Sequence, residues 1–106
     1  MADDRDLKER IRALIDAIAA DCCLPRRSDV EPTLTEGYAR ALELDAECLR
    51  LGQRIDRLTR DVSEGRSVPA GKLSGLLERL HETEQESAHL RELLVPLREV
   101  VAKPAA

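Results

Sequence analysis

The pattern Glu-x-x-His occurs twice in the second half of the chain, at Glu78 to His81 and at Glu86 to His89. A Glu and a His three positions apart share one face of a helix, and di-iron carboxylate proteins bind metal with this unit. Such a site needs the two units on different helices, whereas both fall here on one predicted helix, about 12 Å apart. We therefore interpret His81, Gln85 and His89 as a solvated stripe and expect no metal and no cofactor.

Three cysteines, Cys22, Cys23 and Cys48, are the candidate thiol groups. Adjacent residues on a helix point about 100° apart, so Cys22 and Cys23 do not readily hold one ion together. Cys48 falls in an apolar seam, where a free cysteine commonly acts as a small apolar side chain. Because no His or Asn is placed to activate any of them, we expect no catalytic residue and no enzymatic activity.

Arg50, Arg54 and Arg57 recur at spacings of four and three, so they lie on one flank of a helix. Guanidinium groups bind phosphates through paired hydrogen bonds, and one hypothesis is therefore a site for an anionic small molecule such as a nucleotide. The alternative is a solvated flank whose arginines pair with acids such as Glu47 and Glu82. The sequence leaves both open and favours the second.

Composition limits the partners and the compartment. The net charge is −4 with the signs interleaved, which argues against binding along a nucleic-acid backbone. No stretch approaches the roughly 20 apolar residues of a membrane span. The charged N-terminus is unlike a signal peptide and three cysteines are no disulfide framework, so we expect a cytoplasmic protein. Tyr38 is the only aromatic residue, and the core must consist of aliphatic side chains.

Apolar periodicity predicts an all-α fold of three helices in a single domain that covers the whole chain. The first helix should run from about residue 4 to residue 22, with Asp3 as its cap. Pro25 and Pro32 disfavour helical geometry in the residues that precede them, so 23–32 is a predicted linker.

The second helix is predicted over 33–64, between a capping box of Thr33 and Glu36 and a stop at Gly65. Its small and apolar residues repeat every seven positions, with a second set offset by three, which is typical of a helix packed along one partner helix. These residues are Leu34, Gly37, Ala41, Leu44, Cys48, Leu51, Ile55, Leu58 and Val62.

The third helix is predicted over 69–95, with Pro69 in its first turn and Pro96 kinking or ending it. Its leucines continue a matching seam, so the second and third helices should form a long, coiled-coil-like antiparallel hairpin in which Ser87 faces Cys48. The first helix should pack at the open end of this hairpin. The tail, 103–106, is predicted to be disordered.

Near the turn of the hairpin, four leucines form a strip that no third helix of the same chain would cover: Leu73, Leu76, Leu77 and Leu80. An uncovered apolar strip favours association, and we expect a homodimer or a protein partner. The leading hypothesis is a non-enzymatic interaction module, a small helical adaptor or regulator that self-associates. The alternative is a regulator that senses an anionic ligand through Arg50, Arg54 and Arg57.

Overall fold

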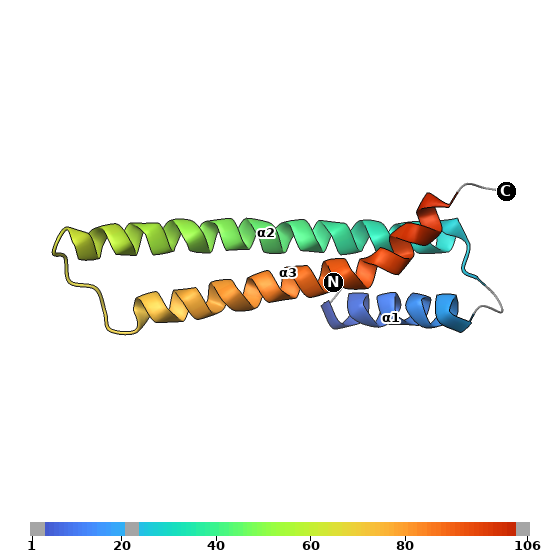
Figure 1. Ribbon diagram of the computed structural model, residues 1–106, viewed down its shortest axis with the longest axis horizontal. Coiled ribbons are helices and arrows are strands. Elements are labelled where there is room, and N and C mark those ends of the chain that lie inside the picture. The colour runs from blue at the N-terminus through green and yellow to red at the C-terminus, as the bar shows by residue number, and fades with distance from the viewer. Residues whose placement is uncertain (1–3, 21–23, 104–106) are drawn as a thin grey trace. The chain divides into compact units, whose positions relative to one another are not determined.

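The computed structural model describes residues 4–20 and 24–103, and its regular elements within these ranges are three α-helices (Figure 1). Helix α1 spans Asp4–Ala20, α2 spans Arg27–Ser63 and α3 spans Lys72–Ala102. The helix against which α2 packs most is α3. The predicted all-α fold is therefore confirmed for the described part of the chain.

The chain divides into two compact units that share α2 and α3. The three-helix unit comprises the chain up to Ala41 and from His89 onward, so it contains α1, the start of α2 and the end of α3. The hairpin unit spans Leu42–Ala88 and contains the remainder of α2 and α3 with the turn that joins them.

The core of the three-helix unit is aliphatic, as the single tyrosine requires. In this unit α1 runs antiparallel to the start of α2 (Figure 1). Each helix buries side chains at spacings of three, four or seven, which places them on one face. The buried apolar residues are Leu7 and Ile11 of α1, Val30, Leu34 and Ala41 of α2, and Leu90, Leu94 and Leu97 of α3.

The predicted linker over 23–32 is wrong in its second half, because α2 already begins at Arg27 and contains Pro32. Arg26 is the N-cap, and its backbone N–H donates to Oδ2 of Asp29 at 3.2 Å. Pro32 costs one backbone hydrogen bond. Complete burial of Val30, two residues before the proline, offsets that cost.

The predicted capping box is also wrong, since Thr33 and Glu36 lie well inside α2. Thr33 is buried. The carboxylate of Glu36 instead forms an ion pair with the guanidinium of Arg10, which ties α1 to α2 within the three-helix unit.

Both predicted ends of α3 need correction. The helix starts at Lys72 and not at residue 69, because Gly71 has φ +82°, a left-handed conformation that interrupts helical geometry. It continues past Pro96 to Ala102, and Leu97 is fully buried directly after the proline. Of the predicted disordered tail, residues 104–106 lie outside the described residues.

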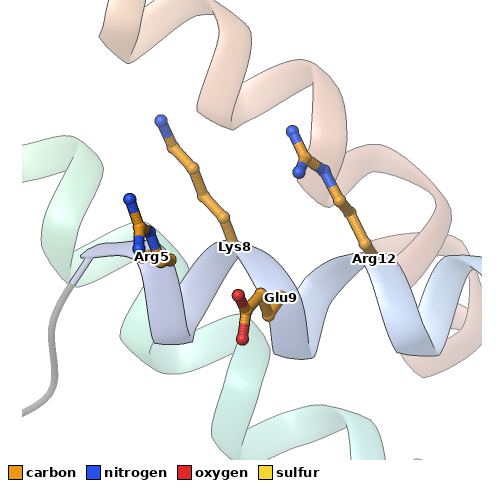
Figure 2. A pocket seen from close by; sticks show the side chains of 4 residues that line it. All are labelled: Arg5, Lys8, Glu9 and Arg12. Atoms are coloured by element: carbon orange, nitrogen blue, oxygen red, sulfur yellow. The ribbon is translucent and has the colours of Figure 1, made fainter.

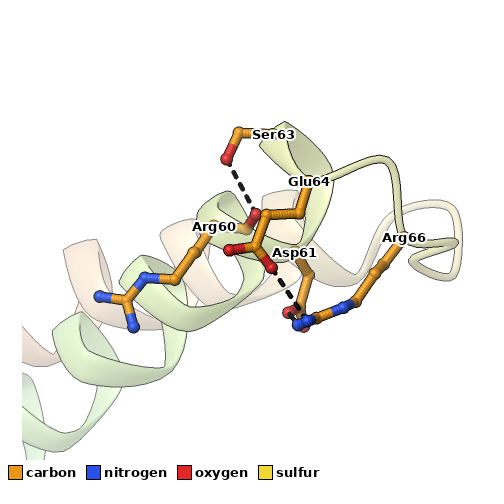
Figure 3. A network of polar contacts seen from close by, with 5 residues as sticks. All are labelled: Arg60, Asp61, Ser63, Glu64 and Arg66. Atoms are coloured by element: carbon orange, nitrogen blue, oxygen red, sulfur yellow. Dashed lines mark hydrogen bonds and ion pairs between the residues drawn. The ribbon is translucent and has the colours of Figure 1, made fainter.

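The end of α2 agrees with the predicted stop at Gly65. With φ +79°, Gly65 reverses the chain; its N–H donates to the carbonyl of Val62 at 3.1 Å, and the N–H of Arg66 donates to that of Asp61 at 2.9 Å. These two bonds define a Schellman cap. Figure 3 shows the Arg66 side chain folded back toward the end of α2, where it pairs with Asp61 at 2.8 Å and Glu64 at 3.0 Å.

Ser87, which the sequence places opposite Cys48, forms a hydrogen bond to another residue of α2. The hydroxyl of buried Ser87 donates to Oδ1 of Asp45 at 2.8 Å, one turn along α2 from Cys48. Thr83, also buried, donates instead to the carbonyl of Arg79 in its own helix at 2.8 Å. We call Thr83, Ser87 and Asp45 the polar layer; it includes a direct side-chain bond between the two helices of the hairpin unit.

Candidate functional site

The residues with potential metal chemistry lie apart from one another. His81, Gln85 and His89 are exposed, as the predicted solvated stripe requires. Among residues 4–20 and 24–103, no group of three or more His, Cys, Asp or Glu side chains could hold a metal ion. The same part of the chain has no helix both long and apolar enough to cross a membrane.

Cys48 is a free, half-buried thiol in the hairpin unit. Burial raises its pKa, and the nearby carboxylates of Glu84, Asp45 and Glu47 raise it further. A raised pKa lowers the thiolate fraction at neutral pH, which is the opposite of what activates a nucleophilic cysteine. Its half-burial agrees with a place in the seam, but the surrounding carboxylates make this environment polar. Cys22 and Cys23 lie outside the described residues.

The arginine flank has a more defined geometry than the sequence indicates. Arg50 and Arg54 line a shallow depression of about 280 Å³ together with Glu47 and Leu51 of α2 and Arg79 of α3. The hypothesis of a solvated flank expects Glu47 to pair with the α2 arginines, and it does not. It accepts a hydrogen bond from Nη2 of Arg79 at 3.2 Å.

A second depression, of about 120 Å³, continues this surface toward the turn. It is lined by Arg54 and Arg57 of α2, by Lys72 of α3, and by the apolar side chains of Leu58 and Leu76. Because Arg54 borders both depressions, the two are neighbours. The structure therefore brings all three predicted arginines onto one surface.

We call this surface the cationic strip and define it by five side chains from two helices: Arg50, Arg54, Arg57, Lys72 and Arg79. Sequence reasoning missed Lys72 and Arg79. Their spacing of seven residues on α3 matches that of Arg50 and Arg57 on α2 and was a usable signal. This spacing shows that Lys72 and Arg79 share one face of α3, but only the pairing of α2 with α3 shows that this face adjoins the arginines of α2.

The predicted leucine strip is partly covered by its own chain. Leu76 is buried, Leu73 and Leu80 are half-buried, and only Leu77, at 48%, is largely exposed. Leu76 is thus unavailable to a partner in this conformation, because it packs inside the hairpin unit.

Two leucines of α2 are more exposed than any residue of that strip. Leu42 and Leu49, on α2 in the hairpin unit, are 64% and 65% exposed. The first helix, predicted to pack at the open end of the hairpin, leaves both side chains uncovered. Their spacing of seven residues, two helical turns, places them on one face.

A separate charged surface lies on α1. Arg5, Lys8, Glu9 and Arg12 line a shallow depression of about 370 Å³. Figure 2 shows Lys8 and Arg12 extending from the same side of α1 and Glu9 on the other. All four side chains come from one helix, so the depression lacks the second wall that the cationic strip has.

Among the described residues, the two histidines and the arginines of the cationic strip lie on exposed helix surfaces. No protein-family model, curated protein or solved structure matches the chain.

Proposed function

We propose that this chain is a non-enzymatic helical interaction module that self-associates through the α2 face of its hairpin unit. The observation that carries the proposal is the exposure of Leu42 and Leu49, at 64% and 65%, on one face of α2. Burying a leucine side chain fully contributes about 1.5–3 kcal/mol, so leaving two in water on one face of α2, two turns apart, favours association.

The thin core of the hairpin unit supports the same proposal. This unit contributes three buried apolar residues, Leu44, Leu51 and Leu76, whereas the described part of the three-helix unit contributes eight. Two helices packed on each other bury only one face each. A further helix against the hairpin unit would supply the burial that the three-helix unit obtains from α1.

A second copy of the chain fits this face better than an unrelated partner does. If two α2 helices cross antiparallel at Ala46, Leu42 of each copy meets Leu49 of the other. Ala46 is small and exposed, which lets the backbones approach. Glu43 and Arg50, also seven residues apart, then lie on the same flank with opposite charges facing each other. The face is therefore complementary to itself in shape and in charge.

Sedimentation equilibrium on the full chain tests the proposal between about 1 and 100 μM, the range expected for a small interface. The wild type should show reversible dimerisation. Combined Leu42→Lys and Leu49→Lys substitutions should leave a monomer whose far-UV circular dichroism is unchanged, because both side chains are exposed.

Leu77→Lys is the matched control, since it places the same charge on another exposed leucine of the hairpin unit. It should preserve the dimer. A wild type that stays monomeric throughout this range would refute self-association. A dimer that Leu77→Lys breaks and the α2 variant preserves would place the interface on the leucine strip of α3 instead.

A further inference from the structure

We infer that the cationic strip binds the phosphate chain of a small polyphosphate, a diphosphate or triphosphate group. This site goes beyond the proposed self-association and uses residues of both helices. Arg50, Arg54 and Arg57 supply one wall and Lys72 and Arg79 the other. Arginine donates paired hydrogen bonds to phosphate oxygens, and lysine adds a compact positive charge.

The unpaired positive charges of the strip favour an anionic ligand. No ion pair or hydrogen bond with another described residue holds the side chains of Arg50, Arg54, Arg57 or Lys72. Like charges three and four positions apart on a helix repel each other. A bound polyanion would convert this repulsion into attraction.

The dimensions favour a short polyphosphate over a longer polymer. From Arg50 to Arg57 the strip covers seven residues of α2, about 10 Å along the helix axis. The two depressions share Arg54 and so provide adjacent positions for linked phosphates. The acidic Glu47 borders one end, and the chain carries a net charge of −4. A nucleic-acid backbone would need basic residues to continue beyond this length.

Glu47 is the one residue bordering the site whose removal should increase the affinity for phosphate. In the unliganded chain its carboxylate holds Arg79 at 3.2 Å, so an incoming phosphate competes with it for the same guanidinium. Glu47 should therefore weaken binding. Removing its charge should strengthen binding, an outcome that a damaged fold cannot mimic.

Isothermal titration calorimetry of the full chain with sodium tripolyphosphate, at an ionic strength of about 0.15 M, tests the inference. Each exposed arginine should contribute up to about fivefold in affinity. Arg54→Gln combined with Arg57→Gln should weaken binding by up to about twentyfold. The control with the same change in net charge is Arg60→Gln combined with Arg98→Gln, two exposed arginines outside the strip, and it should bind within about twofold of the wild type.

Glu47→Gln should bind tripolyphosphate about threefold more tightly. Its control, Glu99→Gln, removes one exposed carboxylate outside the strip and should leave the affinity unchanged. Equal affinities for ATP and tripolyphosphate would place recognition in the phosphate chain, and tighter binding of ATP would add a contribution from the nucleoside.

Three results would overturn the inference: no binding of tripolyphosphate by the wild type, an equal loss in both arginine double variants, or tighter binding of a single-stranded oligonucleotide than of tripolyphosphate.

Arg50 stays unchanged in all variants because it also flanks the proposed dimer face. Titration of the variant that combines Leu42→Lys and Leu49→Lys separates the two proposals. The phosphate site should survive there even when the chain is monomeric.

Discussion

At Gly37, α2 packs closely against Leu94 of α3 in the three-helix unit, and Gly37→Ala tests this contact directly. A Cβ atom added there would lie 2.5 Å from Cδ2 and 2.9 Å from Cδ1 of Leu94. Both distances are far below van der Waals contact, and Leu94 is fully buried. Because Leu94 lies in a close-packed core, its side chain has little room to move away from the added methyl group.

The expected magnitude is the difference between two opposing effects. Overpacking a close-packed core costs about 1–3 kcal/mol. Replacing Gly by Ala in a helix interior contributes about 1 kcal/mol in favour of folding. Gly37→Ala should therefore lower the free energy of unfolding by up to about 2 kcal/mol. Gly52→Ala is the matched control on the same helix, since a Cβ there meets nothing within 4 Å, and it should raise that free energy by up to about 1 kcal/mol.

Urea denaturation followed by far-UV circular dichroism measures both variants, and sedimentation confirms that their oligomeric state is unchanged. Leu94→Ala in the Gly37→Ala background adds a further check. The double variant should lose less stability than the sum of the two single losses, because the new methyl group occupies part of the space that Leu94 leaves. If Gly37→Ala stabilises the chain as much as Gly52→Ala does, the proposed close approach at Gly37 is wrong.

The remaining two predictions concern the polar layer and Cys48 of the hairpin unit. Ser87→Ala and Asp45→Ala, measured alone and combined by urea denaturation, should give a coupling energy of about 1 kcal/mol, because the 2.8 Å bond between Ser87 and Asp45 joins two helices. Additive losses of stability would refute this contribution of the bond. Cys48 should react with iodoacetamide more slowly than an unfolded control at neutral pH, measured with Cys22→Ser and Cys23→Ser in place. Because the pKa of Cys48 is raised in the folded chain, its reaction rate should begin to rise at a higher pH than the rate of the unfolded control. Equal rates in the folded and unfolded chains would contradict this environment.

The repeat of apolar residues predicted the buried face of α2 well where the helix has neighbours on that face. Leu34 and Ala41 are buried in the three-helix unit, and Leu44 and Leu51 in the hairpin unit. Toward the turn the same repeat continues to Val62, yet Val62 is 55% exposed. Periodicity shows which side of a helix is apolar, but the amount of burial depends on how much chain packs against that side.

The start of α2 could not be predicted from local preferences alone. Pro32 and Pro25 favour a linker between them, and the ends of a helix are where sequence patterns are least decisive. Burial decided the outcome, because a helical start at Arg27 places Val30 in the core while Asp29 satisfies the backbone of the N-cap. The core position of Val30 depends on contacts distant in sequence, which a local pattern does not contain.

The pairing of α2 with α3 sets the candidate site, and an apolar repeat specifies this pairing weakly. Sliding one leucine seam along another by seven residues restores nearly the same apolar contacts. Polar pairs remove this ambiguity, since a slide would break the bond between Ser87 and Asp45 and separate Arg79 from Glu47. The pairing that satisfies both also places Arg79 beside Arg50 and Arg54. The residues that fix the alignment of the helices therefore also assemble the cationic strip, which explains why the sequence indicated its α2 half alone.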